Sequence, residues 1–210
     1  MPLLPEFREQ GQFSGARRAG VAGGTEHAGL VAKQFSEISD RLRRFIEDQQ
    51  MFFVGTAARD GRVNVSPKGL DSLKILSPTR VVWLNGTGSG NETAAHLLDV
   101  PRMTIMFCSF VREPMILRLY GTARAVHPGD AEWDEFAALF PPLLGARNIF
   151  DLDIDLVQTS CGYGVPLFEY VDQRELMNSW ATKKGEDGLH EYQHEHNLVS
   201  IDGFPTGLPE

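Results

Sequence analysis

Short strand-like segments separated by turn residues constrain the fold of this chain more than any other feature of its sequence. The chain has 21 glycines and 12 prolines among 210 residues, a content that favours many turns between short strands over long helices. Asp60 and the glycine after it form an Asp-Gly turn signal between two strand-like segments, which predicts a β-hairpin. In all, six segments have the composition or alternation of strands: residues 51–58, 62–66, 80–84, 102–110, 115–126 and 154–164.

Short helical patterns lie before, between and after these strands. Apolar residues at helical spacing predict an amphipathic helix over residues 36–49, with Ser36 as its N-cap. Further helices are expected at residues 91–98, 130–140 and 171–183. The sequence therefore predicts a mainly β (α+β) fold, a six-stranded antiparallel barrel with short capping helices.

Charge and cysteine content exclude several classes of protein. The net charge of −8 argues against broad nucleic-acid binding, because that affinity depends on Lys and Arg neutralising phosphates. No run approaches the ~18 apolar residues of a membrane span, and no apolar segment of signal-peptide type is present. Cys108 and Cys161 lack C-x-x-C spacing, which favours buried reduced thiols over a disulfide or metal site. We expect a cytoplasmic protein that binds neither nucleic acid nor membrane.

The chain divides into three regions by composition. Residues 1–32 are rich in Gly, Ala and Arg without a sustained period, and we expect a flexible leader that is dispensable for ligand binding. Residues 33–165 contain all the predicted strands and form the expected folded domain. Residues 166–210 are expected to form a C-terminal helix and an acidic tail, since residues 185–210 carry six carboxylates and no Lys or Arg.

A glycine-rich loop between a predicted strand and a predicted helix is the most informative local feature. The segment Asn85-Gly-Thr-Gly-Ser-Gly-Asn91 is built of small residues that leave backbone N–H groups free to approach an anion at a helix N-terminus. It is neither a Walker A loop nor G-x-G-x-x-G, and any mobile strand-to-helix turn has a similar composition. The loop alone is compatible with a phosphate site and with an ordinary strand-to-helix turn.

A second feature lies at the end of the predicted hairpin, in the segment Asn64-Val-Ser-Pro-Lys-Gly69. Pro67 is expected to end the ladder of strand hydrogen bonds, Lys68 supplies a positive charge, and Gly69 permits close approach of the backbone. Alone, the segment is equally an ordinary strand end with a solvated lysine. Together with the glycine loop, it suits a phosphorylated planar cofactor.

Three histidines near the C-terminus raise the alternative of a zinc-dependent hydrolase. His190 and His194 match H-E-x-x-H, and His196 adds a third imidazole. Such a motif needs a buried helix and a further ligand downstream, whereas this one lies in the acidic tail. We therefore expect a solvated segment and no metal site.

Other residue types give weaker indications. The sequence contains no recognisable Ser-His-Asp constellation and no nucleophile elbow. Several aromatic residues could line a site for a flat ligand, although ordinary packing explains each of them singly: Trp83, Tyr120, Trp133 and Trp180, with the segment 162–164.

Taken in order, these motifs resemble the pyridoxamine 5′-phosphate oxidase-related family of FMN-binding split β-barrels. The resemblance covers roughly residues 35–165 and rests on an N-terminal helix before a hairpin, followed by four segments: residues 62–69, 82–98, 101–107 and 117–121. No segment is diagnostic alone, but the ensemble is specific. Residues 166–210 are expected to be an extension particular to a subgroup of that family.

The resemblance implies a homodimer with two FMN sites at the subunit interface. The expected cofactor-binding residues are Asn64, Val65, Ser66, Pro67, Lys68 and Gly69 beside the isoalloxazine, and Ser89, Gly90, Asn91 and Thr93 at the phosphate. Gly86 and Gly88 are expected to help the backbone reach that phosphate.

The resemblance does not extend to pyridoxamine phosphate oxidation. The vitamin-processing members end in an Arg-x-His element, which is missing after residue 165, and the position where they carry a Gln aligns here with Ile116. The expected function is that of an FMN-dependent oxidoreductase of unknown substrate, with no side chain nominated as catalytic. A flavin-binding or sensing protein without turnover is the alternative from another class.

Overall fold

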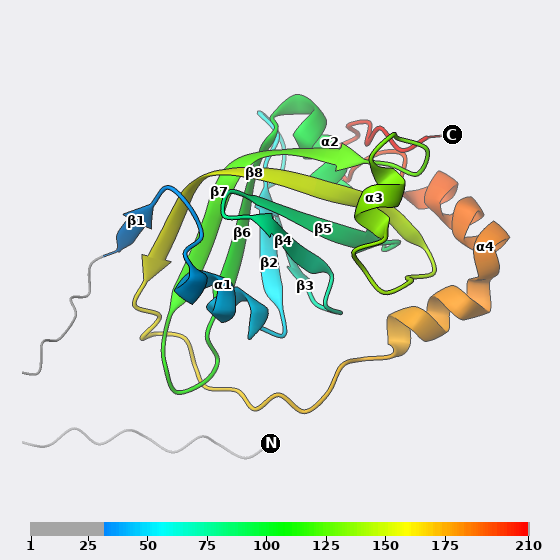
Figure 1. Cartoon of the computed structure of the whole chain (residues 1–210). Coiled ribbons are helices and arrows are strands. Elements are labelled where there is room, and N and C mark those ends of the chain that lie inside the picture. Colours follow the sequence, from blue (N-terminus) through cyan, green and yellow to red (C-terminus); the bar gives the residue numbers. More distant parts are fainter. Residues whose placement is uncertain (1–31, 210) are drawn as a thin grey trace, which may run out of the picture.

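The structure, a computed structural model, describes residues 32–209 (Figure 1). Residues 1–31 of the expected leader lie outside the described residues. The elements are β1 (Lys33–Phe35), α1 (Asp40–Glu47), β2 (Phe52–Thr56), β3 (Asn64–Lys68), β4 (Leu73–Ser77), β5 (Arg80–Gly86), α2 (Glu92–Asp99), β6 (Arg102–Cys108), β7 (Ile116–Val126), α3 (Trp133–Ala137), β8 (Ala146–Ser160) and α4 (Leu176–His196).

All the strands belong to one antiparallel sheet, which confirms the predicted mainly β fold. The strand order is β3-β2-β6-β7-β8-β5-β4, and β1 pairs with the C-terminal end of β8. Within residues 32–209 no pairing joins β3 to β4, so the curled sheet is a split barrel (Figure 1). The number of strands was predicted wrongly, because eight are present. The prediction missed the three-residue β1 and the short β4, and β8 begins eight residues before its expected start.

The first helix is shorter than predicted. Phe35, which was expected to start the helical pattern, belongs to β1 and pairs with Val157. The side chain of Ser39, and not that of Ser36, caps α1 by accepting a hydrogen bond from the N–H of Leu42. The apolar face of α1 then packs Leu42 and Ile46 into the core.

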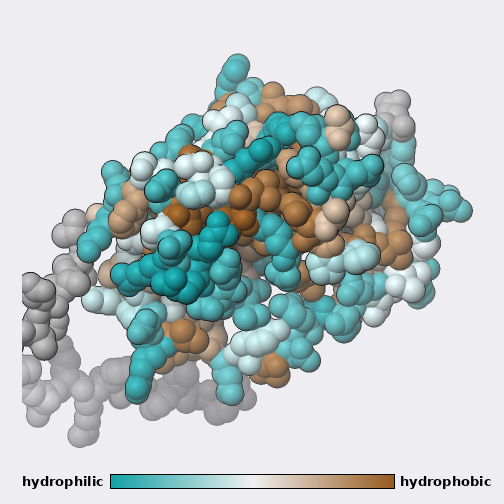
Figure 2. Space-filling model, viewed as in Figure 1, coloured by the Kyte–Doolittle hydropathy of each residue, from teal (hydrophilic) through white to brown (hydrophobic). Residues whose placement is uncertain are grey.

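The C-terminal region contains far more helix than predicted. A helix was expected over 171–183, whereas α4 continues to His196, with a kink at Gly185, whose φ is 69°. Before α4, residues 162–175 run in an extended path that contains no helix or strand (Figure 1). Several apolar side chains of this path are exposed: Leu167, Phe168, Tyr170 and Val171. In the same view, hydrophobic residues gather near the centre of this face and at separate points along its lower margin (Figure 2).

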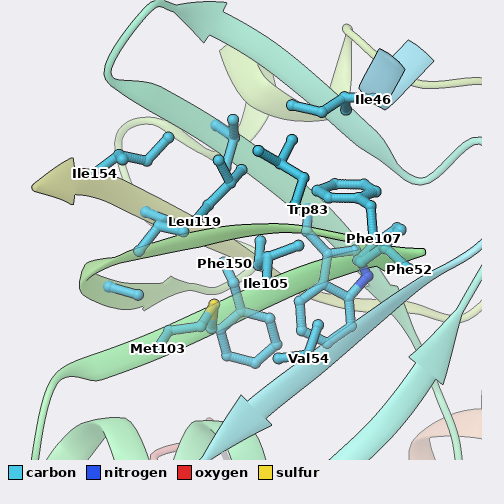
Figure 3. Close-up of a cluster of buried hydrophobic side chains, with 14 of the residues drawn as sticks. Ile46, Phe52, Val54, Trp83, Met103, Ile105, Phe107, Leu119, Phe150 and Ile154 are labelled. Carbon is cyan, nitrogen blue, oxygen red and sulfur yellow. The ribbon is translucent and has the colours of Figure 1, made fainter. Parts of the chain in front are cut away.

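The main core lies inside the curled sheet and is built around aromatic side chains (Figure 3). Trp83 of β5 stacks on Phe150 of β8, with ring centroids 4.7 Å apart, and meets Phe52 edge to face at 6.2 Å. Phe52 in turn lies 5.8 Å from Phe107. Such aromatic pairs stabilise a core beyond the area that they bury, so β2, β5, β6 and β8 are held in fixed relation around the site described below.

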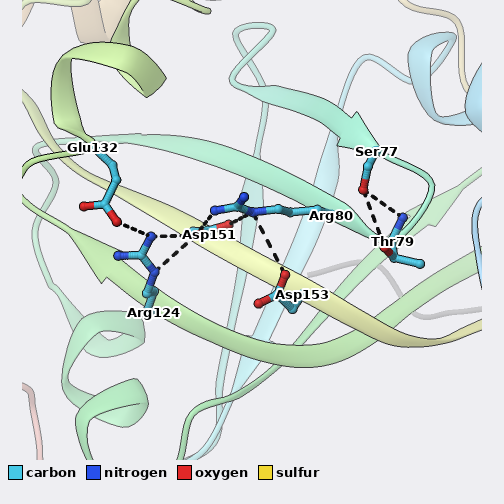
Figure 4. A network of polar contacts seen from close by, with 7 residues as sticks. All are labelled: Ser77, Thr79, Arg80, Arg124, Glu132, Asp151 and Asp153. Carbon is cyan, nitrogen blue, oxygen red and sulfur yellow. Dashed lines mark hydrogen bonds and ion pairs between the residues drawn. The ribbon is translucent and has the colours of Figure 1, made fainter.

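A network of charged side chains lies over the sheet near α3 (Figure 4). Asp151 accepts hydrogen bonds from Arg80 and Arg124, and Arg124 also pairs with Glu132. Burial opposes ionisation of Asp151, but the hydrogen bonds from Arg80 and the charges of both arginines hold the pKa of this carboxyl below its usual value. Asp151 precedes the strand predicted over residues 154–164, but it lies inside β8.

Two further expectations concern the described residues. Cys108 and Cys161 are both free thiols, but only Cys108 is buried. Within residues 32–209, none of the helices is both long and apolar enough to span a membrane.

Candidate functional site

A groove of about 1550 Å³ brings the two predicted segments together. Its walls come from β3, from the loop between β5 and α2, from residues 140–143 and from the segment 170–180. Nine of the ten predicted cofactor-binding residues line this groove, as do Gly86 and Gly88. The structure therefore joins, in one concave site, two motifs that are separate in the sequence.

Val65 is the predicted residue that does not line the groove. It lies on the opposite face of β3 from Asn64 and Ser66, with an exposed fraction of 66%. The alternation of a strand explains this, because neighbouring side chains point to opposite faces. Pro67 does not end the strand as predicted, since it pairs with Phe53; β3 is an edge strand, where a residue without an N–H is tolerated.

Lys68 brings a positive charge into the groove. Its Nζ lies 4.9 Å from the centroid of the Trp83 ring, over the electron-rich face. Burial, and then the positive charge of Arg147, lower the pKa of Lys68 to about 8. The side chain is therefore mostly charged at neutral pH although its surroundings oppose that charge.

Arg147, at the start of β8, is a second cation of the groove, and no motif pointed to it. Its side chain is 3% exposed. One guanidinium nitrogen donates to the carbonyl of Gly90 at 3.0 Å, another donates to Oδ1 of Asn197, and the buried Nε has no partner within the described residues. Burial lowers the pKa of Arg147 to about 10, with Tyr192 acting in the opposite direction. The only sign of Arg147 in the sequence was its place at the start of a strand segment that contains several apolar residues.

No carboxylate offsets these two cations. Among residues 32–209, no Asp or Glu forms an ion pair with either Lys68 or Arg147 at up to 4.0 Å. The groove does contain carboxylates, but none of them lies within 4.0 Å of Lys68 or Arg147: Glu47, Asp71, Glu92, Asp172 and Glu175. Asp71 pairs with Lys74, and the carboxylate of Glu92 accepts the backbone N–H of Ile201 at 3.0 Å. A half-buried lysine and a buried arginine, neither of them paired with a carboxylate, are chemically suited to bind an anion.

The start of α2 lies beside this charge. Asn91 occupies the N-cap position, but its side chain makes no capping hydrogen bond. Its Oδ1 accepts from Asn148 and its Nδ2 donates to the carbonyl of Asn197, both at 3.4 Å. Thr93 accepts a hydrogen bond from Asn64 at 3.1 Å. The side chains of these predicted ligands therefore stabilise the loop. The side chain of Asn91 does not accept from the backbone N–H groups in the first turn of α2, so these groups are left for another acceptor.

The turn between β3 and β4 was not predicted as part of the site. Leu70 and Asp71 have φ values of 62° and 51°, which non-glycine residues rarely adopt. Ser72 follows, and its buried Oγ has no partner within the described residues. All three line the groove. Backbone strain of this kind is commonly retained where a turn must present groups to a ligand.

The aromatic residues considered earlier divide into two groups. Trp83 and Trp180 line the groove, whereas Tyr120, Trp133 and the segment 162–164 do not. Trp180 meets Tyr192 edge to face, with ring centroids 5.1 Å apart. Both belong to α4, so this helix supplies an aromatic wall opposite the sheet.

The C-terminal histidines belong to α4 and not to an irregular tail, although the segment is solvated as expected. His190, His194 and His196 are all exposed. In the part of the chain that the structure describes, no group of three or more His, Cys, Asp or Glu residues is placed to hold a metal ion.

Comparisons with known proteins identify relatives along most of the chain. Residues 38–161 match the model of the pyridoxamine 5′-phosphate oxidase family. A pyridoxamine 5′-phosphate oxidase family protein of Aspergillus flavus, ustO, is 38% identical over 191 residues, which are 81% of this chain and 76% of that protein.

Solved structures give more distant likenesses. A Lactobacillus delbrueckii protein named for pyridoxamine 5′-phosphate oxidase has a TM-score of 0.48 and 18% identity, and covers 59% of this chain and 94% of its own. HupZ of Group A Streptococcus has a TM-score of 0.47 and 17% identity, and covers 62% of this chain and 99% of its own. Likenesses at this level carry no information about ligands.

Proposed function

The chain belongs to the pyridoxamine 5′-phosphate oxidase family, and from that premise we propose that it is an FMN-binding flavoprotein that acts as an oxidoreductase. Lys68 binds the phosphate, together with the backbone of the glycine loop and the start of α2, and Arg147 adds a second positive charge beside them. Residues 64–69 of β3 line the place of the ring. The bound flavin supplies the redox chemistry, and the protein supplies orientation and electrostatics.

One observation carries this proposal: the half-buried Lys68 and the buried Arg147 both line the groove, and no carboxylate of residues 32–209 lies within 4.0 Å of either cation. Burying an unpaired charge destabilises a protein, and a bound anion would offset this cost for Lys68 and Arg147. Ser89 and Gly90 at the end of the loop add backbone N–H groups beside the uncapped helix start. The residues present therefore fit a phosphorylated cofactor.

The groove also has space for a second molecule. Pockets for drug-sized ligands measure roughly 300–1,000 Å³, and this groove measures about 1550 Å³. The wall formed by Trp180 and Tyr192 would exclude water from one side of a bound substrate. The missing Arg-x-His element argues against pyridoxamine phosphate as that substrate, and its identity stays open.

The proposed flavoprotein is a homodimer with cofactor sites at the subunit interface. Two sets of exposed apolar side chains support a second copy as the partner: Val63 and Val65 on and beside the edge strand β3, and Leu167, Phe168, Tyr170 and Val171 in the extended segment. Unpaired edge strands and apolar surfaces of this kind favour association. Light scattering on the eluting protein is expected to give the mass of two chains, and the mass of one chain would contradict the dimer.

The experiment for the whole proposal is to purify the full chain, denature it and analyse the released small molecules. We expect FMN, recovered directly or after the protein is incubated with it. Reduction of the bound flavin by NADH, NADPH or an organic reductant would then support the oxidoreductase. A protein that holds FMN but accepts electrons from none of them would instead be a flavin carrier or sensor.

A further inference from the structure

The chain after α4 folds back onto the glycine loop. Asn197, at the end of α4, is fully buried. Its Nδ2 donates to the carbonyl of Gly88 at 3.0 Å, and its Oδ1 accepts the hydrogen bond from Arg147. Its own carbonyl accepts hydrogen bonds from Thr206 at 2.7 Å and Asn91 at 3.4 Å. One amide side chain thus joins the loop to the cation behind it.

Neighbouring residues attach the same region at further points. Gln193 donates to Thr87 Oγ1 at 2.7 Å, which fixes the beginning of the loop. The backbone N–H of Ile201 donates to Glu92 in the first turn of α2, and Asp202 pairs with Arg62 of the hairpin. Residues 193–202 therefore contact the glycine loop, the start of α2, Arg147 and the turn between β2 and β3.

We propose that Arg147 is a direct ligand of the cofactor phosphate and that Asn197 is the positioning residue that holds its guanidinium in place. This inference rests on the proposed function and extends it to two residues that no motif indicated. Arg147 is buried, borders the groove and keeps an Nε–H that no described residue accepts. A phosphate oxygen is the acceptor that suits an arginine best.

The chemistry of Asn197 supports the positioning role. A carboxylate at this position would also accept a hydrogen bond from Arg147, but it would neutralise the charge that the phosphate needs. A neutral amide orients the guanidinium and leaves its full positive charge directed at the groove. The Nδ2 group of the same amide donates to the carbonyl of Gly88, so the guanidinium of Arg147 and the glycine loop are held at a fixed distance from each other.

A purely structural role makes a different prediction. If Arg147 and Asn197 only attach the C-terminal segment to the loop, their loss would weaken binding of any flavin equally. Riboflavin separates the two cases because it has the same ring system as FMN but no phosphate. The ratio of the dissociation constants for FMN and riboflavin therefore reports on the phosphate site alone.

The experiment measures both dissociation constants, at fixed ionic strength, for the wild-type chain and for Arg147→Met, Asn197→Asp and Lys183→Met. Each variant lowers the net charge by one, and Lys183 is an exposed residue of α4 outside the groove. We expect the first two variants to weaken FMN by at least about tenfold. Arg147→Met loses a charge-assisted hydrogen bond to the phosphate, whereas the carboxylate of Asn197→Asp neutralises the charge of Arg147. Riboflavin should change by less than about twofold, and Lys183→Met should change neither ligand.

Riboflavin binding also shows whether each variant folds. If Arg147→Met does not fold, Arg147→Lys replaces it and should weaken FMN selectively by a smaller factor. Equal losses of FMN and riboflavin, or no loss of FMN, would overturn the inference while leaving the proposed function intact. A wild-type chain that binds neither flavin would overturn the proposed function and this inference with it.

Discussion

Lys68 and Arg147 are unfavourable side chains to bury in the absence of a ligand. Each has a pKa that burial lowers, and the positive charge of Arg147 lowers that of Lys68 further. Residues retained against the stability of the fold are characteristic of functional sites. For single residues, the positive charges of Lys68 and Arg147 are therefore the property to test.

Replacing Lys68 should lower the affinity for FMN. Lys68→Ala is expected to weaken FMN by roughly tenfold or more, because a cation facing the phosphate is lost. His190→Ala, on the exposed face of α4, should leave FMN binding unchanged. Titration of both variants by flavin fluorescence measures the difference, and equal effects would show that the cofactor lies elsewhere.

The pH dependence of binding follows from the same lysine. Lys68 in the free protein is protonated below a pKa of about 8, and a bound phosphate stabilises that protonated form. Its pKa is therefore higher in the complex, and the affinity for FMN should fall as the pH rises above about 8, by at most about tenfold per pH unit. Riboflavin affinity should show no such fall, and Lys68→Met should remove the dependence.

At the scale of elements, the bulge between β7 and β8 shows how a local backbone feature shapes the sheet. The register shifts between Tyr120 and Gly121, and a Cβ added at Gly121 would lie 1.9 Å from the carbonyl oxygen of Asp153. No side chain can occupy that position without moving the strand. The closely packed bulge therefore depends on glycine.

Gly121→Ala is expected to lower the free energy of unfolding by more than about 2 kcal/mol, the range typical of steric conflict in a core. Gly164→Ala is the matched control, because a Cβ at Gly164 would meet nothing within 4 Å. Chemical denaturation of the two variants gives the comparison. A Gly121→Ala variant as stable as Gly164→Ala would show that β7 and β8 adapt at this point.

Elements also explain what the sequence could and could not predict. The hairpin, the loop before α2 and the cation Lys68 were predictable, because each depends on residues close together in the chain. Arg147 and Asn197 were not, since they are 50 residues apart and meet only when α4 folds back over the loop. The extent of α4 was missed because its polar, histidine-rich second half has no apolar stripe of helical period.

At the scale of the whole molecule, the curled sheet fixes one wall of the groove and the C-terminal region supplies the other. The aromatic core around Trp83 holds β2, β5, β6 and β8 in place, and β3 pairs with β2, while α4 and the residues after it cover the loop. The C-terminal region, residues 166–209, therefore forms part of the groove and is not a separate tail. Cofactor binding should accordingly stabilise the domain and its C-terminal region together.

The central claim is that this groove binds FMN through its phosphate. Titration of the purified full chain with FMN, followed by quenching of flavin fluorescence, tests it most directly, with riboflavin titrated in parallel. We expect saturation at one FMN per chain and a clearly weaker affinity for riboflavin. No saturable binding of FMN, or equal affinities for the two flavins, would contradict it.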